Sequence, residues 1–224
     1  MFSYAGRTEA PVAQPLPQRI GGFGGIPGLV SYLREQSISH VVDATHPFAA
    51  RISRNALAAC DQAGVALITL ERPPWTPAAQ DRWTEVPDIA SAVAALPAQP
   101  RRIFLAIGRQ NLEDFAARSE HHYILRLVDQ PGGALPLPQS TVILARGPFT
   151  LEGDLQLMRE QAVQLVVSKN AGGVGARAKL DAARVLGIGV VMIGRPPLPE
   201  RACVASVAEV LEWLHRPHPA NLGV

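Results

Sequence analysis

One stretch decides the expected fold of this chain: Val41-Val42-Asp43-Ala44-Thr45-His46-Pro47-Phe48-Ala49-Ala50-Arg51-Ile52-Ser53. Residues 38–42, which overlap the start of this stretch and have only Ser39 and His40 as polar residues, predict a short buried strand. Small apolar residues then recur at helical spacing from 48 to 63, and Gly64 supplies a stop, so this part predicts a helix. Pro47 suits the first helical turn, where a missing N–H costs little. Residues 43–46 are therefore a strand-to-helix loop.

Three residues of this loop can hydrogen-bond or move a proton: Asp43, Thr45 and His46. In open α/β sheets, such loops leave the carboxyl ends of parallel strands, where ligands bind, and the helix start beyond them favours anionic groups. The placement predicts a ligand site. The alternative is structural: Asp43 and Thr45 would satisfy backbone donors, and His46 would lie on the surface.

Composition narrows the class of protein. The chain has 224 residues, of which 47% are hydrophobic, and a net charge of +2, which suits two small domains or one large one and does not indicate a nucleic-acid surface. Cys60 and Cys203 match no metal or redox spacing, so we expect two core thiols in a reducing compartment. We find no membrane-spanning run and no signal-peptide pattern. We therefore expect a cytoplasmic protein with neither nucleic acid nor membrane as a partner, and no metal.

Strand and helix patterns alternate along the rest of the chain, which predicts an α/β fold with parallel sheets. The predicted strands cover 2–5, 65–70, 83–86, 103–107, 123–128, 141–145, 164–167 and 190–193, and the predicted helices cover 26–36, 89–96, 112–117, 151–161, 176–186 and 205–214. Thr150 is well placed as the N-cap of one helix. Periodicity breaks at 97–102, and we place a domain boundary there, giving domains 1–99 and 100–224.

Two glycine-rich segments invite a phosphate-loop interpretation. The first is Ile20-Gly21-Gly22-Phe23-Gly24-Gly25, in which Pro27 takes the place of the third glycine and no convincing strand comes before it. A tight turn under a packed Phe23 is the interpretation that we favour there. The second is Ser168-Lys169-Asn170-Ala171-Gly172-Gly173-Val174-Gly175, which lies between a predicted strand and a predicted helix.

The second segment contains Gly173-Val174-Gly175-Ala176-Arg177-Ala178, which satisfies the G-x-G-x-x-A pattern of dinucleotide-binding loops. The strand that follows ends in Gly194-Arg195, where an acidic residue would bind an unmodified ribose. An arginine at this point would suit a 2′-phosphate, and hence NADP over NAD. The alternative is that these glycines serve a loop that binds nothing.

Four motifs together carry a resemblance to a known family: Asp43-Ala44-Thr45-His46-Pro47-Phe48-Ala49, Gly108-Arg109-Gln110, Arg146-Gly147-Pro148-Phe149 and Ser168-Lys169-Asn170-Ala171-Gly172-Gly173. In this order they resemble the precorrin-6A reductase family of cobalamin biosynthesis. The resemblance implies an NADPH-dependent reduction of one double bond in a corrin-ring precursor. It also implies two Rossmann-like α/β domains with parallel sheets and the active site in a cleft between them.

The chain departs from that family at its start. Members typically open with a strand, a Gly-rich loop and a helix, and the strand at Phe2 would correspond to the second strand of the family. We therefore expect either a start that was assigned too late or a truncated form. In both cases, a sheet edge of the first domain would be exposed.

The resemblance and the chemistry together suggest roles for individual residues. His46 is the candidate acid for protonating the ring, with Asp43 as its orienter and Thr45 beside it; water is the alternative source of the proton. Arginines would clamp the carboxylates of the tetrapyrrole substrate, although some could form structural ion pairs instead. The candidate cofactor contacts are Ser168, Lys169, Asn170, Gly172, Gly173, Gly175, Arg177 and Arg195, and the candidate substrate contacts are Arg7, Arg51, Gly108, Arg109, Gln110, Arg146 and Gly147.

Two other functions are alternatives to the reductase. A non-catalytic tetrapyrrole- or nucleotide-binding protein would share the fold and the loops but have no turnover. A Rossmann-like enzyme acting on a nucleotide sugar is the other, but no Tyr-x-x-x-Lys pair supports it.

Overall fold

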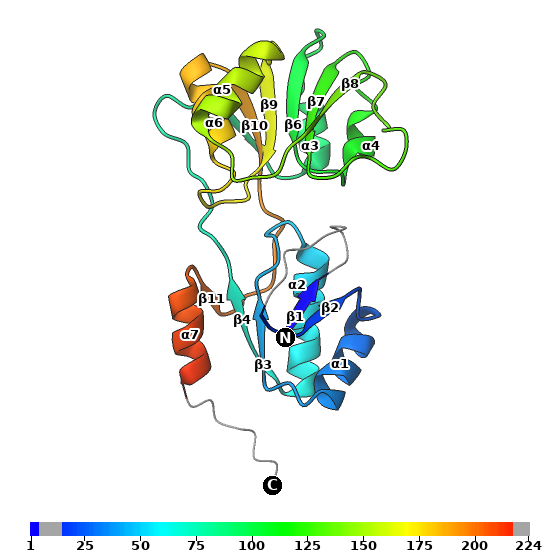
Figure 1. Cartoon of the computed structure of the whole chain (residues 1–224), viewed down its shortest axis with the longest axis vertical. Helices are drawn as coiled ribbons and strands as arrows, with labels where there is room; N and C mark the ends of the chain where they lie inside the picture. Colours follow the sequence, from blue (N-terminus) through cyan, green and yellow to red (C-terminus); the bar gives the residue numbers. More distant parts are fainter. Residues whose placement is uncertain (5–14, 217–224) are drawn as a thin grey trace. The chain divides into compact units, whose positions relative to one another are not determined.

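The computed structural model describes residues 1–4 and 15–216 of the chain. It forms two compact units, one made of Met1–Arg72 with Pro197–Val224 and the other of Pro73–Pro196 (Figure 1). The chain passes from one unit to the other twice. Each crossing lies at a pair of prolines, Pro73-Pro74 and Pro196-Pro197.

This division differs from the predicted boundary between residues 99 and 100. The strand Trp83–Val86 pairs with the strand Gly189–Ile193, so it belongs to the second unit although it comes before that boundary. The C-terminal strand and helix belong to the first unit, because Cys203–Val204 pairs with residues 69 and 70. Parallel pairing joins residues far apart in the sequence, and a local break at 97–102 carries no information about it.

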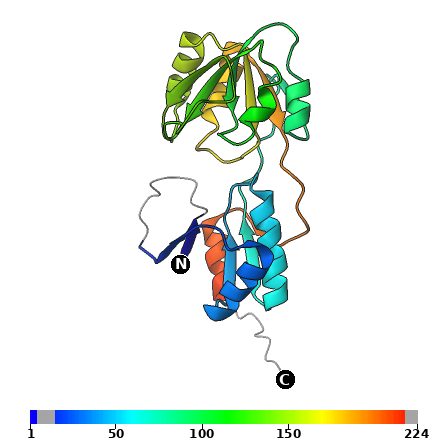
Figure 2. The ribbon, with the colours of Figure 1, turned by 90° about the vertical axis from the view of Figure 1, so that its right-hand side faces the viewer.

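The second unit is a six-stranded sheet with helices on both faces. Its elements are β5 (Trp83–Val86), α3 (Ile89–Ala94), β6 (Arg102–Ala106), α4 (Leu112–Phe115), β7 (His122–Leu127), β8 (Ser140–Leu144), α5 (Leu151–Glu160), β9 (Leu165–Lys169), α6 (Ala178–Leu186) and β10 (Gly189–Ile193). The strands run in the order β5-β10-β9-β6-β7-β8, and every pair is parallel. Figure 2 shows helices on the two sides of this sheet.

The core of the second unit lies on both faces of its central strands. Phe104, Ile124, Val166 and Leu180 are completely buried, from β6, β7, β9 and α6 respectively. Because helices cover both faces, these strands are nearly continuous apolar runs, as parallel strands usually are. Thr150 caps α5 as predicted, since its side chain accepts a hydrogen bond from the Gly153 N–H at 3.1 Å.

The order of the strands creates a switch point between β9 and β6. From β6 the chain moves on to β7 and β8 on one side, whereas from β9 it moves on to β10 on the other side. The loops after β6 and β9 therefore leave in opposite directions from neighbouring strands. In open α/β sheets, ligands bind at such a place, outside the carboxyl ends of the strands.

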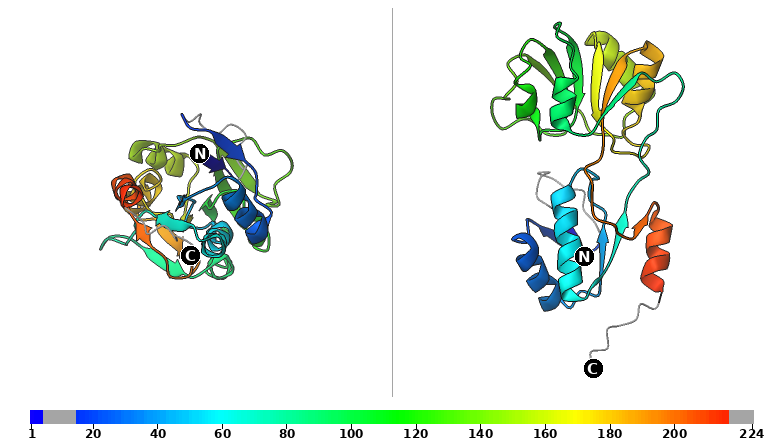
Figure 3. Two further views of the ribbon diagram at one scale, coloured as in Figure 1. Left: turned by 90° about the horizontal axis from the view of Figure 1, so that it is seen from below. Right: turned by 180° about the vertical axis from the view of Figure 1, so that it is seen from behind.

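The first unit contains a three-stranded parallel sheet, β11-β4-β3, and a separate pair of parallel strands, β1 and β2. Its elements are β1 (Phe2–Tyr4), β2 (Gln18–Ile20), α1 (Gly25–Glu35), β3 (His40–Asp43), α2 (Ala50–Ala63), β4 (Ala66–Leu70), β11 (Cys203–Val204) and α7 (Val207–His215). Leu29 and Leu33 of α1 pack against Ala56 and Ala59 of α2. Figure 3 shows α2 and α7 on opposite sides of the β3–β4 pair.

Some details differ from the sequence predictions. The strands β2 and β11 were not predicted, because three and two residues are too few for a periodic pattern. Helix α2 begins at Ala50, after a turn at Pro47 and Phe48. Cys60 is buried as predicted, but Cys203 is exposed, because it lies on a two-residue strand at the edge of the sheet. Within the described residues, β3 has no neighbour on its other side, so the expected exposed sheet edge is present.

The predicted α/β class with parallel sheets is confirmed by the strand pairing in both units. Among the helices of the described residues, none has the length and apolar character needed to span a bilayer.

Candidate functional site

The glycine-rich loop after β9 lies at the switch point of the second unit and requires glycine in its centre. Gly172 and Gly173 have φ values of 69° and 75°, a conformation that favours glycine. A Cβ atom on Gly172 would lie 2.2 Å from the Pro73 carbonyl oxygen and 2.5 Å from Nη2 of Arg195. The backbone of the loop therefore packs directly on the segment that enters the unit.

Two of the predicted cofactor contacts hold the loop from within. Asn170 is buried, and its Oδ1 accepts a hydrogen bond from the Trp75 N–H at 2.8 Å while its Nδ2 donates to the Trp75 carbonyl at 2.9 Å. Ser168 is completely buried and donates to the carbonyl oxygen of Lys169. This differs from the prediction of direct cofactor contacts, because both side chains face the interior of the unit.

The other polar residues of the loop lie closer to its surface. Lys169 donates from Nζ to Oδ1 of Asn111 at 3.3 Å, which connects the loops after β9 and β6 across the switch point. Arg177, the N-cap residue of α6, pairs with Asp181 at 3.3 Å. Arg195 follows β10 and donates from Nε to the Asn170 carbonyl at 3.0 Å. The structure thus brings the predicted Lys169, Arg177 and Arg195 to one loop.

Lys179 lies beneath this loop and was not predicted as a functional residue. The chain has two lysines, Lys169 and Lys179, and they flank the loop on both sides. The ammonium group of Lys179 donates to the Ala176 carbonyl at 2.5 Å and lies 4.8 Å from the centre of the Trp75 ring. Burial and, to a smaller extent, the charge of Arg126 lower the pKa of Lys179 to about 8, against the opposing effect of Asp154.

The loops after β6, β7 and β8 bring two predicted substrate arginines to one place. Arg109 donates from Nη2 to the carbonyls of Asp129 and Gln130, the latter at 2.9 Å. Arg146 lies with Nη2 3.7 Å from Oδ1 of the same Asp129. The side chain of Arg146 is half exposed, at 52%. Two guanidinium groups thus meet at the exit of β7, and both retain donors for an anionic ligand.

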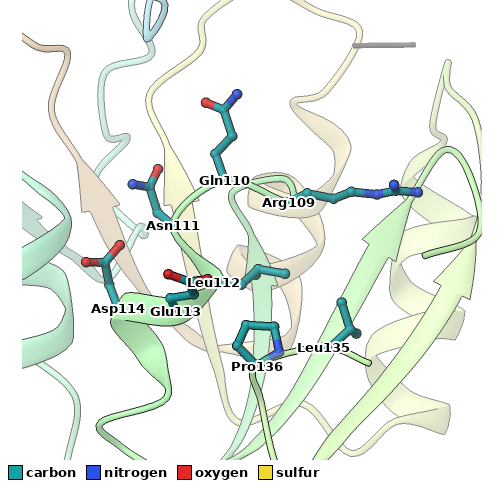
Figure 4. A pocket seen from close by; sticks show the side chains of 8 residues that line it. All are labelled: Arg109, Gln110, Asn111, Leu112, Glu113, Asp114, Leu135 and Pro136. Carbon is teal, nitrogen blue, oxygen red and sulfur yellow. The ribbon is translucent and has the colours of Figure 1, made fainter. Parts of the chain in front are cut away.

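A pocket of about 410 Å³ opens beside Arg109 and Gln110 at the carboxyl end of β6 (Figure 4). The lining residues are Arg109, Gln110, Asn111, Leu112, Glu113, Asp114, Leu135 and Pro136. Figure 4 shows the side chains of Arg109 and Gln110 extending in different directions from the rim. Gly108, at the start of this loop, has a φ of 78° and turns the chain away from the sheet.

The Arg146-Gly147-Pro148-Phe149 loop is held by a buried ion pair. Arg126 of β7 pairs with Asp154 of α5, and the Asp154 side chain is only 1% exposed. The guanidinium group of Arg126 also lies 3.5 Å from the centre of the Phe149 ring. A Cβ atom on Gly147 would lie 3.3 Å from that ring. The predicted Gly147 thus allows the loop to pack closely on Phe149, which in turn positions Arg146.

The Asp43–His46 loop of the first unit has a well-defined set of contacts. Oδ1 of Asp43 accepts a hydrogen bond from the Thr45 N–H at 3.0 Å, and Oγ1 of Thr45 lies 3.2 Å from Oγ of Ser53 on α2. Nδ1 of the exposed His46 accepts from the Phe48 N–H at 3.2 Å. Asp43 therefore satisfies a backbone donor, as the structural alternative predicts. Its role as the orienter of His46 stays a prediction.

Helix α2, which follows this loop, has a start that favours an anion. Its N-cap is Ala49, with no side-chain cap, and its first turn contains no acidic residue. Arg51 is exposed in that turn, where the helix dipole adds to its positive charge. Arg51 thus remains a candidate for a substrate carboxylate. Arg7, the fourth predicted arginine, lies outside the described residues.

The first glycine-rich segment binds the side chain of Arg19 through its carbonyl groups. Arg19 donates from its two terminal nitrogens to the carbonyls of Gly21 and Gly22, each at 2.7 Å, and lies 3.8 Å from the centre of the Phe23 ring. An anion would need N–H groups in that position. The strand β2 does come before this segment, but the contacts favour the tight turn over the phosphate loop.

These features define a class of protein. A doubly wound parallel sheet with a glycine-rich loop at its switch point is the architecture of dinucleotide-binding α/β proteins. The chain matches the family model of the precorrin-6x reductases CbiJ/CobK over residues 1–215, and it belongs to that family. The family resemblance seen in the four motifs is thereby confirmed.

Relatives that are similar to the chain are named precorrin-6A reductase or cobalt-precorrin-6A reductase. The chain is 62% identical over 214 residues to the precorrin-6A reductase of Rhodobacter capsulatus, which covers 96% of this chain and 85% of that protein. It is 46% identical over 217 residues to a precorrin-6A reductase of Sinorhizobium sp, covering 95% and 83% respectively. It is 30% identical over 200 residues to the cobalt-precorrin-6A reductase of Priestia megaterium, covering 83% and 76%. A solved structure of CobK precorrin-6A reductase matches with a TM-score of 0.92 and 62% identity, over 95% of this chain and 85% of that chain.

We predict that Gly172→Ala destabilises the second unit and that Gly175→Ala does not. The added methyl group at 172 would collide with the Pro73 carbonyl and force an unfavourable φ, whereas at 175 no atom lies within 4 Å. We expect the Gly172→Ala variant to lose about 2 kcal/mol or more of unfolding free energy. Thermal melting of both variants measures this. Equal melting temperatures would contradict the close packing of the loop.

We also predict that Lys179 makes stability depend on pH above neutrality. Because the folded-state pKa is about 8 against an ordinary value of 10.5, the unfolded state binds more protons between these values. The stability of the wild type relative to Lys179→Met should therefore rise with pH across this window and be flat below it. Cys60 and Tyr123 titrate at high pH in both proteins, so their contributions cancel in the difference. Denaturant unfolding from pH 6 to 10.5 measures it, and a constant difference would contradict the buried charge.

Proposed function

We propose that this protein reduces one double bond of precorrin-6A with NADPH, in cobalamin biosynthesis. The observation that carries the proposal is membership of the precorrin-6x reductase family, with 62% identity to a relative named precorrin-6A reductase. Identity is 62% and 46% to two of the relatives named for precorrin-6A, and 30% to one of those named for cobalt-precorrin-6A. This ranking supports a substrate ring without cobalt.

The glycine-rich loop after β9 fits the pyrophosphate of the cofactor. Its glycines leave room for the backbone to approach a ligand, and the N-terminus of α6 follows directly. Lys169 and Arg177 would neutralise phosphate charge at the two ends of the loop, and Gly173 and Gly175 would line it. Bound there, NADPH supplies the hydride for the reduction. Arg195, which reaches the loop from β10, would bind the 2′-phosphate.

The carboxylates of the tetrapyrrole would be bound by arginine side chains. Arg109 and Arg146 meet at Asp129 in the second unit, and Arg51 stands at the uncapped start of α2 in the first. A guanidinium group has five N–H donors, so a bond to a protein carbonyl leaves others for a substrate. Gly108, Gln110 and Gly147 would shape the loops that carry these arginines.

His46 would donate the proton that completes the reduction. The reduced bond takes a hydride at one carbon and a proton at the other. His46 is exposed at the carboxyl end of β3, so its ring can exchange protons with solvent between turnovers. Asp43 and Thr45 would hold the loop in place, through the Thr45 N–H and the Ser53 hydroxyl. As an imidazolium, His46 would release the Phe48 N–H, because both ring nitrogens would then carry protons.

The proposed activity is tested by incubating the purified protein with precorrin-6A and NADPH. We expect NADPH to be oxidised in equal amounts with the formation of a dihydro product, observed by absorbance and mass spectrometry. Binding of both ligands without turnover would instead identify a non-catalytic binding protein.

The cofactor preference makes a second prediction. We expect NADPH to bind about tenfold or more tightly than NADH, because a charge-assisted hydrogen bond to the 2′-phosphate is worth about 1.5–3 kcal/mol. Arg195→Gln should reduce this ratio, whereas the exposed Arg159→Gln on α5 should leave it unchanged. Calorimetric titration with both cofactors measures the ratio. Equal affinities in the wild type would rule out the 2′-phosphate contact.

The role of His46 is tested with two substitutions. If His46 is the acid, both His46→Ala and His46→Gln should lower turnover by about 10²-fold while NADPH affinity stays unchanged. Glutamine can still donate a hydrogen bond but cannot deliver a proton at neutral pH. Recovery of turnover in the glutamine variant, with only the Michaelis constant raised in the alanine variant, would make His46 a positioning residue. Normal kinetics in both variants would remove it from the active site.

A further inference from the structure

Two side chains donate hydrogen bonds to backbone carbonyls of the glycine-rich loop and of the residue that follows it. The carbonyl of Gly173 accepts a hydrogen bond from Nε1 of Trp75 at 2.7 Å, and the carbonyl of Ala176 accepts from Lys179 at 2.5 Å. The loop also has backbone bonds at its ends, from the Asn170 N–H to Ile193 at 2.9 Å and from the Arg177 N–H to Val174 at 3.2 Å. Trp75 and Lys179 thus hold two carbonyls between these ends, and Arg195 holds the Asn170 carbonyl.

Trp75 contacts this loop at its start and in its middle, and it is connected to the end of the loop through Lys179. Its backbone N–H and carbonyl pair with the side chain of Asn170, and its indole N–H binds Gly173. Its ring lies under the ammonium group of Lys179, which in turn holds Ala176. Trp75 is 5% exposed; its bonds to Asn170 are buried, and its bond to Gly173 is partly buried. One residue thus connects three points of a loop rich in glycine.

Such anchoring matters because glycine loses more conformational freedom on ordering than any other residue. A loop that is already ordered when a ligand arrives does not lose that freedom on binding, so the ligand is held more tightly. When the donor of a partly buried hydrogen bond is removed, water replaces it only incompletely. The indole N–H of Trp75 is therefore expected to influence ligand affinity through the shape of the loop.

We propose that Trp75 is a positioning residue for the cofactor, acting through the glycine-rich loop; the proposal rests on the proposed binding of NADPH to this loop. Trp75 follows directly after Pro73-Pro74, where the chain enters the second unit. Arg195, which binds the Asn170 carbonyl, stands just before the crossing at Pro196-Pro197. Both connecting segments of the chain are thus bonded to the same loop.

The test compares Trp75→Phe with Trp83→Phe. The first substitution keeps an aromatic ring under Lys179 and the backbone bonds to Asn170, but it removes the indole donor to Gly173. The second makes the same chemical change on β5 in the same unit. The buried Nε1 of Trp83 has no hydrogen-bond partner in the described part of the chain, so this variant loses no such bond. Two quantities are measured: amide hydrogen exchange of residues 172–177 without ligand, and the dissociation constant for NADPH.

We expect Trp75→Phe to speed amide exchange in the loop and to raise the NADPH dissociation constant by about fivefold. The turnover number at saturating NADPH should stay within about twofold of the wild type, and Trp83→Phe should change none of these quantities. Unchanged loop exchange in Trp75→Phe would overturn the positioning role. Faster exchange with an unchanged dissociation constant would overturn the connection to the cofactor. A wild type that does not bind NADPH would instead refute the proposed function, and the exchange data would still decide whether Trp75 orders the loop.

Discussion

The paired hydrogen bonds between the Asn170 side chain and the Trp75 backbone are the contact on which the arrangement of the glycine-rich loop depends. The primary amide supplies one donor and one acceptor, as a neighbouring strand would, so both backbone groups of a buried residue are satisfied. This allows the incoming segment to pass directly against the loop. Gly172 then has no space for a side chain beside Pro73, and the indole of Trp75 reaches the Gly173 carbonyl.

Much of the fold could be predicted from sequence because its signals are local. Alternating apolar strands and helices predict the α/β class, and the Thr150 cap and the Gly64 helix stop are in place. The domain boundary depends on the pairing of β5 with β10, which no local pattern reports. The double prolines at both crossings were a usable signal, since they stand where the units divide.

The sequence indicates which loops form the candidate site, but it was interpreted less well for the direction in which their side chains point. Ser168 and Asn170 are two residues apart at the end of β9, so they point to the same face, and that face is the interior. Lys169 points the other way, toward Asn111. This alternation was available from sequence. Trp75 and Lys179 could not be found in that way, because their roles depend on contacts across about 100 residues of chain.

Arginine and lysine have different roles near the loops of the second unit, and the difference follows from the chemistry of their side chains. Arg109 and Arg146 bind protein carbonyls or a carboxylate and still retain donors, so structural and ligand-binding roles do not exclude each other. The ammonium group of Lys179 lies over the Trp75 ring and donates to the Ala176 carbonyl, where a compact ammonium group fits and a planar guanidinium would need further partners.

The division of the first unit into two stretches of chain has a consequence for its assembly. Residues 73–196 form one continuous stretch, so the second unit can complete its sheet as soon as β10 has been synthesised. The first unit must wait for β11, which pairs with β4 from the other side of that insertion. A ribosome therefore finishes the second unit first, although the first unit begins the chain. A substitution or truncation that removes β11 would for the same reason destabilise the sheet that β3 and β4 form, beside the Asp43–His46 loop.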